Sequence, residues 1–470
     1  MAPGGDGRTG LVTIDGRLDA LRSAISGEVV VPADGGYDEA RSTFNATIDR
    51  RPAAIARPRS TDDVAAAVRW ARQAGLPIAI RGGGHSVAGH ATADEALVID
   101  LRLIKEVVVD PARRVAMVGG GALWEDVDRA TVDHGLAMPG GTFGDTGVGG
   151  LALGGGIGFL MGTGGLTCDT LVRAEVVTAD GSVVIAGDGG DPELLWALRG
   201  GGGNFGIVTR FEFALQPVGP LYAGQLSFPI ESAELVMKTL VELAEDAPDE
   251  LAIFAGGPGR LEEADGVEPG GQSPIVFGAT VVYQGAPGAG EAVLRPLRAL
   301  PIVEDRLATM TYLEVQRLAG ELPFGLRHYW KGHLLRALDD GSIDSIVAAM
   351  ARAPGDSFVL MEAITGAARR EPADGAAFGQ REARWNVSGI GVWEDPAEDE
   401  RQIAWVRDLA DALGPGSLTG AGYANYAPVD ETPLRVQAAF GAERFARLAA
   451  VKRRYDPDNV FRFNLNIPPG

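Results

Sequence analysis

The stretch that decides the fold of this chain runs from Arg81 to Cys168. It opens with Arg81-Gly82-Gly83-Gly84-His85-Ser86 and, over residues 139–168, reads PGGTFGDTGVGGLALGGGIGFLMGTGGLTC. Because glycine lacks a Cβ, such backbone can adopt positive φ and come within hydrogen-bonding distance of a ligand. The free N–H groups of successive turns then form concave sites that suit phosphate oxygens. With a third cluster at 200–206, the pattern favours a pyrophosphate-binding surface over the alternative, a loop-rich β protein with tight turns.

The composition excludes several classes of partner. Of 470 residues, 46% are hydrophobic and 22% are charged, which is typical of a globular protein of two or three domains. The net charge of −21 opposes binding to nucleic acid and to anionic membranes, and no apolar run reaches the length of a membrane span. The single cysteine excludes an intramolecular disulfide, and the polar start Met1–Gly10 does not resemble a signal peptide. We expect a cytoplasmic protein.

Local patterns indicate an α+β fold. Ser60 or Thr61 can cap a helix over 64–74 that stops at Gly75. The remaining patterns predict helices around 17–25, 123–134 and 193–199, strands at 78–80, 98–101, 107–109 and 115–118, and a hairpin over 175–185 that turns at Asp180-Gly181. Because strands and helices mix without strict β-α-β alternation, we predict an α+β fold instead of a doubly wound parallel sheet.

A change of composition divides the chain. Gln216 to Pro220 resembles a linker, and glycine becomes rarer beyond it. A longer helix is expected over 233–246, with strands near 275–283 and 358–364 and a basic helix over 440–455. These patterns predict a first domain over 1–218 and a second over 219–420.

Taken one at a time, the reactive residues are ambiguous. A histidine after a glycine turn, such as His85, is more often a structural hydrogen-bonding group, and a lone Cys168 is more often an inert buried thiol. One cysteine and five scattered histidines give no metal-ligand spacing, so no metal site is predicted. No GxSxG turn surrounds a serine, and residues 154–158 do not follow the GxGxxG pattern.

Several segments in order carry a more specific signal: 81–86, 139–150, 153–158, 165–169, 203–208 and the tail 455–469. Together they resemble the FAD-linked oxidases of the berberine bridge enzyme type, in the vanillyl-alcohol oxidase and p-cresol methylhydroxylase (PCMH) superfamily. The resemblance covers about 54–469. It implies a two-domain α+β fold of the PCMH type, in which 421–470 return to the FAD-binding domain and 219–420 form an antiparallel sheet, backed by helices, over the isoalloxazine.

The resemblance implies that FAD is held covalently twice, by His85 at the flavin 8α-methyl and by Cys168 at the flavin C6. Two links would prevent loss of the flavin and raise its redox potential. The other positions that match the family's FAD-binding segments are Arg81, Gly82, Gly83, Gly84, Ser86, Gly140, Gly141, Asp145, Thr146, Val148, Gly149, Gly150, Gly155, Gly158, Gly206, Ile207, Val208, Asn464 and Asn466. Leu465 departs from the family tail, which commonly has glutamine there.

The resemblance also implies hydride transfer to flavin N5 while a base takes a substrate proton. Tyr426 matches the family's tyrosine base, whose pKa of about 10 must be lowered by a cation or by hydrogen-bond donors. Tyr423 is either its partner or a core aromatic residue. Lys331 stabilises a tyrosinate, binds an acidic substrate or is a solvated strand lysine, and Arg381 is expected to be structural. Val148 matches the small residue that lets dioxygen approach the flavin.

We therefore expect a bicovalent FAD-dependent oxidase that acts on an alcohol, a sugar or a phenolic small molecule, with dioxygen as acceptor and hydrogen peroxide as product. Two alternatives stay open. One is oxidation of a C–N bond in an amine or alkaloid with the same flavin. The other is a flavin-carrying binding protein with little turnover.

Overall fold

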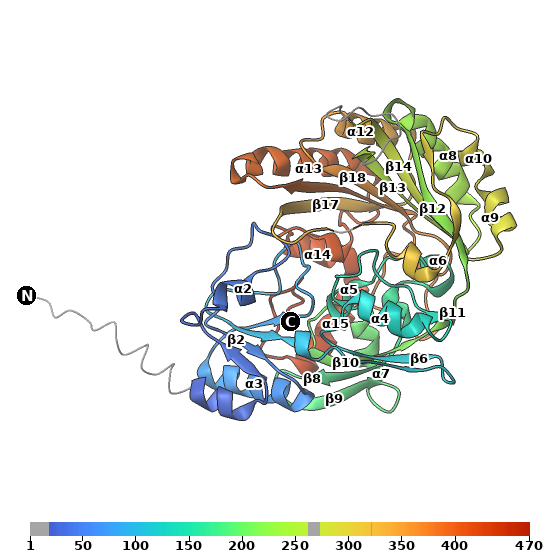
Figure 1. Cartoon of the computed structure of the whole chain (residues 1–470). Coiled ribbons are helices and arrows are strands. Elements are labelled where there is room, and N and C mark those ends of the chain that lie inside the picture. The colour runs from blue at the N-terminus through green and yellow to red at the C-terminus, as the bar shows by residue number, and fades with distance from the viewer. Residues whose placement is uncertain (1–17, 262–272, 321) are drawn as a thin grey trace, which may run out of the picture.

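The computed structural model describes residues 18–261, 273–320 and 322–470, so Met1–Gly10 and the expected helix start at position 17 lie outside the described residues. The described chain forms two parts, one above the other in the view of Figure 1. The upper part is a large sheet with helices on its outer face, and the lower part holds smaller sheets and helices. This is the two-domain α+β fold that the sequence predicts. For the division of the chain we propose the boundaries given above.

The N-terminal sheet is organised around helix α3 (Thr61–Ala74). Ser60 caps it by accepting a hydrogen bond from the Asp63 N–H, and Gly75 ends it in the left-handed conformation with φ 71°. The helix joins two strands that flank β4 in parallel pairing, and its apolar face packs on them. The strand order is β1 (Glu28–Val30), β2 (Ala54–Arg57), β4 (Leu97–Asp100), β3 (Ile78–Arg81). Helix α2 (Tyr37–Arg41) lies in the loop before β2.

The middle sheet is antiparallel, and its last two strands form the predicted hairpin. Its order is β5 (Val107–Asp110), β6 (Val115–Gly119), β10 (Ile207–Ala214), β8 (Leu171–Val177), β9 (Val183–Gly187). The connections hold helices α4 (Trp124–Val132), α5 (Val148–Gly154), α6 (Met161–Gly164) and α7 (Pro192–Leu198). The expected linker at 216–220 is partly a strand, because β11 (Gln216–Pro217) pairs with β7 (Leu136–Ala137).

The large sheet is also antiparallel. Its order is β15 (Glu304–Asp305), β12 (Leu221–Pro229), β14 (Ile275–Tyr283), β13 (Leu251–Arg260), β18 (Phe358–Ala363), β19 (Trp385–Trp393), β17 (Arg327–Leu335), with β16 (Ala308–Met310) also on β12. Helices α8 (Ala233–Glu245), α12 (Asp340–Met350) and α13 (Asp399–Leu413) cover its outer face, and the short helices α9 (Pro287–Val293), α10 (Arg295–Arg298) and α11 (Tyr312–Val315) complete this part (Figure 1).

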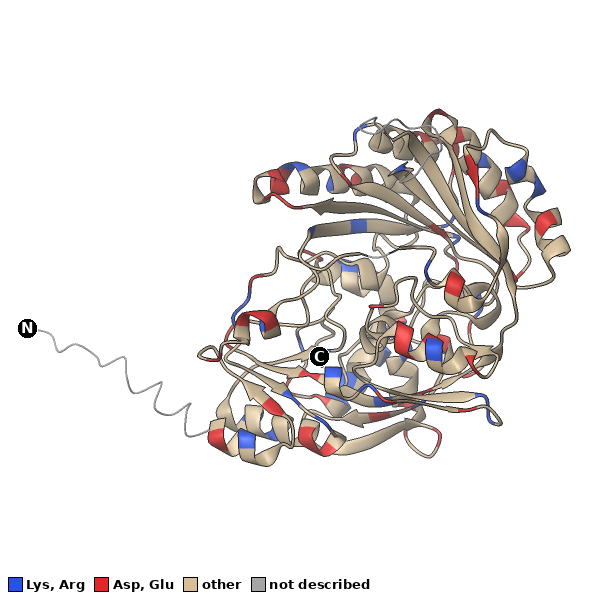
Figure 2. Ribbon diagram, in the orientation of Figure 1, with Lys and Arg blue, Asp and Glu red and all other residues tan. Residues whose placement is uncertain are grey.

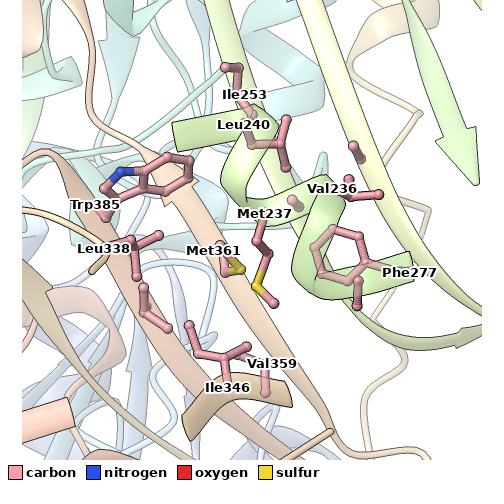
Figure 3. Packing of buried hydrophobic residues seen from close by; sticks show 14 of the residues in the cluster. Val236, Met237, Leu240, Ile253, Phe277, Leu338, Ile346, Val359, Met361 and Trp385 are labelled. Carbon is pink, nitrogen blue, oxygen red and sulfur yellow. The ribbon is translucent and has the colours of Figure 1, made fainter. Parts of the chain in front are cut away.

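The two faces of the large sheet have different environments. Figure 3 shows the core between the outer helices and the sheet, where Met237 of α8 and Ile346 of α12 lie near Met361 of β18. Side chains of a strand point alternately to opposite faces. Phe358, Leu360 and Glu362 of β18 therefore point away from this core, and they line a cavity on the inner face.

Charged residues gather on helices and loops, whereas the strands of the large sheet are almost free of them (Figure 2). Within the described ranges, no helix combines the length and the apolar character that a bilayer crossing requires.

The C-terminal segment returns to the lower part of the molecule. The helix expected over 440–455 is interrupted at Gly441, whose φ of 74° separates α14 (Pro433–Phe440) from α15 (Ala442–Tyr455). Leu448 and Val451 of α15 pack into the core of the middle sheet. The tail after α15 then reaches the loop at 200–206.

Lys452 fixes this tail. Its fully buried ammonium lies 2.6 Å from Asp456 Oδ2 and donates to the carbonyl oxygens of Asn204 (2.8 Å) and Phe461 (2.9 Å). We expect Lys452→Ala to lower the free energy of unfolding by about 3–5 kcal/mol, because it leaves the Asp456 carboxylate buried without its counter-charge. Chemical denaturation measures this loss. The control Lys238→Ala removes a half-exposed lysine from surface ion pairs and should leave the midpoint of unfolding nearly unchanged. An equally unchanged midpoint for Lys452→Ala would contradict the prediction.

Candidate active site

A cavity of about 1490 Å³ lies between the inner face of the large sheet and the glycine-rich loops below it. The loops contribute parts of 82–86, 146–150 and 200–208, and the sheet contributes Phe254, Trp330, Leu360 and Glu362. Residues 423–427 and 463–465 of the C-terminal segment close the lining. The cavity is therefore built by segments that are far apart in the sequence.

Most of the predicted site residues line this cavity: Gly82, Gly83, Gly84, His85, Ser86, Thr146, Gly149, Gly150, Gly206, Ile207, Val208, Asn464, Tyr423 and Tyr426. The other predicted residues, all of them described, lie outside the lining: Arg81, Gly140, Gly141, Asp145, Val148, Gly155, Gly158, Cys168, Asn466 and Lys331.

The lining glycines serve two different purposes. An added Cβ on Gly83 would lie 2.5 Å from the backbone nitrogen of Gly147, so only glycine allows these two loops to meet. Gly150 and Gly203 have no atom within 4 Å of an added Cβ, and Gly82 has none nearer than 3.6 Å. These three positions leave open space beside exposed backbone, which a ligand can occupy.

Four of the predicted glycines pack protein segments together and do not line the cavity. A Cβ on Gly158 would lie 2.1 Å from the carbonyl oxygen of Gly140, and one on Gly141 would lie 2.8 Å from the Leu151 side chain. Gly155, with φ 134°, faces the ring of Tyr423. These glycines therefore have a packing role, and their placement does not support the predicted contact with the cofactor.

Arg81 and Val148 also have roles other than the predicted ones. The buried Arg81 guanidinium donates to the carbonyl oxygens of Ala40 (2.5 Å) and Arg41 (3.1 Å), so it caps the C-terminus of α2. Val148 opens α5, and its side chain packs in the core of the middle sheet. Its placement does not support a path for dioxygen, because its side chain points into that core.

His85 follows β3 and borders the cavity. Its imidazole stacks on Phe44, with ring centroids 4.2 Å apart, and its Nε2 lies 3.2 Å from Asp145 Oδ1 without hydrogen-bond geometry. Asp145 thus contacts His85 but is not part of the cavity wall. The ring is held at the wall next to a carboxylate that can take up a proton.

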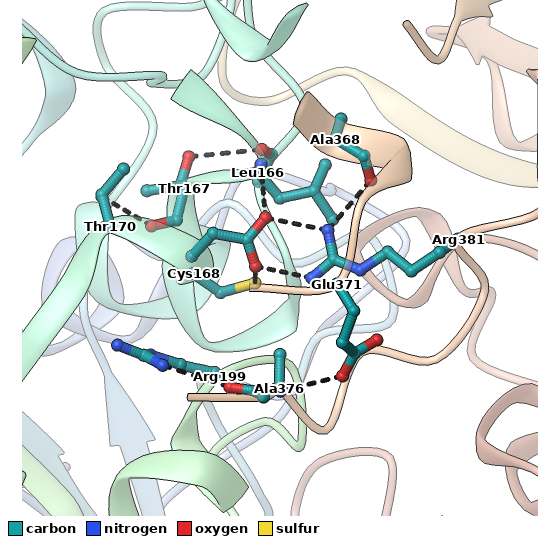
Figure 4. A network of polar contacts seen from close by, with 12 residues as sticks. Leu166, Thr167, Cys168, Thr170, Arg199, Ala368, Glu371, Ala376 and Arg381 are labelled. Carbon is teal, nitrogen blue, oxygen red and sulfur yellow. Dashed lines mark hydrogen bonds and ion pairs between the residues drawn. The ribbon is translucent and has the colours of Figure 1, made fainter. Parts of the chain in front are cut away.

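Cys168 lies in the network of Figure 4, outside the cavity. Its fully buried thiol donates to Asp169 Oδ1 over 3.6 Å, and Asp169 pairs with the buried Arg381 at 2.5 Å. Burial, with the nearby Asp169 charge, raises the pKa of the Cys168 thiol well above its usual value. A raised pKa disfavours the reactive thiolate. This placement does not support the predicted bond to flavin C6, whereas the structural role expected of Arg381 agrees with its pairing.

Glu362 is the site residue that sequence reasoning missed. Tyr426 Oη donates to its Oε1 (2.9 Å), and Asn386 Nδ2 donates to its Oε2 (2.5 Å). Glu362 is 1% exposed, and burial raises the pKa of its carboxyl to about 7 against the opposing effect of these hydrogen bonds. The sequence does contain an indication of this residue, because Glu362 is the one charged residue among the described residues of the apolar strand β18.

The tyrosine predicted as the base has a different environment from the one expected. Burial, and next the Glu362 charge, raise the pKa of Tyr426 well above its usual value. Tyr423 is held by hydrogen bonds to its Oη from the backbone N–H groups of Gly156 (2.7 Å) and Ile157 (3.2 Å) and from the Asn425 amide (2.8 Å). Tyr423 thus anchors a glycine turn, and Tyr426 is the tyrosine in contact with the carboxyl group.

Lys331 is not part of the cavity. Along β17, Trp330 lines the cavity, and Tyr329 packs in the core on the outer face with its hydroxyl 2.9 Å from Asp430 Oδ1. Because side chains alternate along a strand, Lys331 lies on the face of Tyr329. This placement agrees with the alternative of a solvated strand lysine and does not support a catalytic role for Lys331.

The three tail residues Asn464, Leu465 and Asn466 have different surroundings. Asn464 borders the cavity and donates to the carbonyl oxygens of Gly203 and Phe461, both at 3.2 Å. The Leu465 carbonyl accepts a hydrogen bond from Asn204 (3.2 Å), a contact of the backbone that does not depend on the side chain at this position. Asn466 lies outside the lining, with its Oδ1 buried and without a hydrogen-bond partner in the described chain.

The lining residues fit FAD. The glycine positions 82, 150 and 203 leave space beside free backbone, as a pyrophosphate requires. Asn464 Oδ1 is a buried polar atom without a hydrogen-bond partner among the described residues, and Asn464 borders the cavity. Buried polar atoms are normally satisfied, so unpaired ones at a cavity indicate a ligand. In the described ranges no group of His, Cys, Asp and Glu could hold a metal ion.

Fold and site together define an FAD-dependent oxidoreductase. The family model of the FAD binding domain matches residues 52–187, and that of the berberine and berberine-like family matches residues 422–468. The chain is 33% identical over 465 residues to (R)-6-hydroxynicotine oxidase of Paenarthrobacter nicotinovorans, covering 95% of this chain and 97% of that relative. The chain therefore belongs to the berberine bridge enzyme-like family of FAD-linked oxidoreductases in the PCMH superfamily.

Solved structures agree with this assignment. 6-Hydroxy-D-nicotine oxidase from Arthrobacter nicotinovorans superposes with a TM-score of 0.84 at 30% identity, covering 95% of this chain and 98% of that one. Glucooligosaccharide oxidase from Acremonium strictum, which carries a 6-S-cysteinyl, 8α-N1-histidyl FAD, superposes with a TM-score of 0.84 at 25% identity, covering 97% and 99%. The predicted family, fold and FAD-dependent enzyme class are confirmed.

Proposed function

We propose that this protein is an oxidase that removes a hydride from a small molecule and transfers the electrons to dioxygen, with hydrogen peroxide as product. The observation that carries the proposal is the hydrogen bond from Tyr426 to the buried Glu362 on the cavity wall. A carboxyl group whose pKa is about 7 can accept a proton near neutrality, as a general base must.

When bound, FAD supplies the acceptor for the hydride and passes two electrons on to dioxygen. The chain supplies the proton path. A hydroxyl or amine proton of the substrate moves to Tyr426 Oη while the hydroxyl proton of Tyr426 moves to Glu362 Oε1. The raised pKa of Tyr426 keeps its hydroxyl protonated, so Tyr426 acts as a relay and Glu362 as the base. Asn386 holds the second carboxylate oxygen in place.

For the flavin we propose attachment through His85 alone. His85 borders the cavity, whereas the Cys168 thiol is packed outside it. The second link of the glucooligosaccharide oxidase is the alternative, and it would require the Cys168 side chain to leave its buried surroundings.

The wall around Glu362 narrows the class of substrate. Phe159, Phe254, Leu360 and Trp330 give it an apolar and aromatic surface. A sugar needs many polar partners for its hydroxyl groups, so this wall favours a more apolar alcohol, phenol or amine. The amine alternative is supported further by the relative named (R)-6-hydroxynicotine oxidase and by the buried carboxyl group, which suits an ammonium partner.

The proposal is tested by turnover in air. The purified yellow protein is assayed with a peroxide-coupled dye against panels of apolar amines, aromatic alcohols, phenols and oligosaccharides. We expect peroxide with members of the first three panels and little with the oligosaccharides. A flavin that stays reduced in air after substrate or dithionite addition would instead support a binding protein with little turnover.

A further inference from the structure

A stack of aromatic rings connects His85 to the large sheet. Phe44 lies against the His85 imidazole with centroids 4.2 Å apart and ring planes 18° apart. His328 of β17 stacks on Phe44 with a centroid distance of 4.2 Å and an angle of 19°. Phe44 is fully buried and His328 is 1% exposed. The stack therefore runs from the glycine turn after β3 to the sheet that covers the cavity.

Hydrogen bonds hold Phe44 in this stack. Its N–H donates to the Gly84 carbonyl, one residue before His85, over 3.2 Å. The neighbouring Asn45 donates to the carbonyl oxygens of Val87 (2.7 Å) and His328 (2.9 Å) and accepts from the His328 N–H (2.9 Å). These bonds fix the backbone at Phe44 between the glycine turn and the large sheet.

We propose that Phe44 is a positioning residue for the covalent attachment of the flavin to His85. This inference rests on the proposed function, in which His85 carries FAD. A ring stacked flat on the imidazole restricts its rotation and leaves Nε2 beside Asp145 (3.2 Å). Holding a reacting group in one orientation converts an encounter into a preorganised reaction.

The attachment step balances without any group beyond flavin and dioxygen. A ring nitrogen of His85 forms a bond to the flavin 8α carbon. That carbon and the imidazole each lose one proton, and the electron pair of the broken C–H bond passes to the flavin. Dioxygen then takes up these two electrons and two protons as hydrogen peroxide. Asp145, whose side chain is 41% exposed, can take the imidazole proton and release it to solvent.

The test compares Phe44→Leu with the wild type in samples taken at intervals during expression. Total flavin is measured from the visible spectrum of the native protein, and covalent flavin from fluorescence that stays with the band on a denaturing gel. We expect Phe44→Leu to bind FAD but to attach it about two- to tenfold more slowly, in line with the strength of a stacked pair. Attachment at the wild-type rate in this variant overturns the proposal.

Two controls separate positioning from folding. Phe44→Tyr keeps the ring and should restore the wild-type rate. Phe324→Leu removes a half-exposed ring that meets His85 only edge-on, at 5.4 Å, and should leave the rate unchanged. If Phe44→Leu does not fold, Phe44→Met fills the space without a ring, and a wild-type rate in that variant overturns the proposal equally. A wild type without covalent flavin refutes the attachment itself, whatever the variants do.

Discussion

Replacing Glu362 by glutamine should slow reduction of the bound flavin by substrate by about 100-fold or more, which is the usual contribution of a positioned general base. Glutamine keeps the shape of the side chain and can still accept from Tyr426, but it cannot take up the proton. Flavin content and the visible spectrum should stay unchanged, because Glu362 contacts Tyr426 and Asn386 on the sheet side of the cavity. Stopped-flow reduction without oxygen measures the step directly.

The pH dependence of flavin reduction gives a second test of Glu362 as the base. The carboxyl of Glu362 has a pKa of about 7, and only its ionised form accepts a proton. The wild-type reduction rate should therefore rise with pH through about 7 and level off above it. Glu362→Gln should lose this rise.

Glu231→Gln is the matched control, because Glu231 also lines the cavity but is exposed. It should keep both the rate and the pH profile of the wild type. A Glu362→Gln variant that is reduced at the wild-type rate would place the base elsewhere.

Replacing His85 by alanine should abolish covalent attachment of the flavin. In acid or on a denaturing gel the yellow colour should leave this variant completely, whereas it stays with the wild-type band. His85 is the proposed point of attachment, and its imidazole borders the cavity. The native variant should still bind FAD through the glycine turns, so its spectrum before denaturation measures binding separately from attachment.

Cys168→Ala is the matched control for this experiment. If His85 is the single point of attachment, the alanine variant keeps its covalent flavin and an unshifted visible spectrum, because the thiol packs beside Asp169 and Arg381. A shifted spectrum in Cys168→Ala, or flavin retained by His85→Ala after denaturation, would restore the double link.

Local signals in the sequence predicted local structure well. The Ser60 cap and the Gly75 stop define α3, and Asp180-Gly181 turns the hairpin between β8 and β9. The order of the glycine segments was enough to indicate the family and its fold. For the helix and the hairpin the determining contacts lie within a few residues of one another, so the pattern itself contains them.

The site was harder to predict where it depends on side-chain direction. Arg81 and Val148 belong to recognisable segments, yet the backbone turns both of them away from the cavity. Glu362 lies on β18 and Tyr426 lies 64 residues later, so they meet only because the C-terminal segment returns beneath the large sheet. No spacing in the sequence contains that contact.

The return of the C-terminal segment has a consequence for the order in which the protein matures. Lys452 and Asn464 secure the loop at 200–206, yet a ribosome makes them only after the whole of the large sheet. Domains otherwise tend to fold in the order of their synthesis. The cavity that binds FAD is therefore completed late in synthesis. Until the C-terminal segment has been translated, the loop at 200–206 lacks the contacts that hold it in place. Loading of the cofactor therefore follows the synthesis of Lys452 and Asn464.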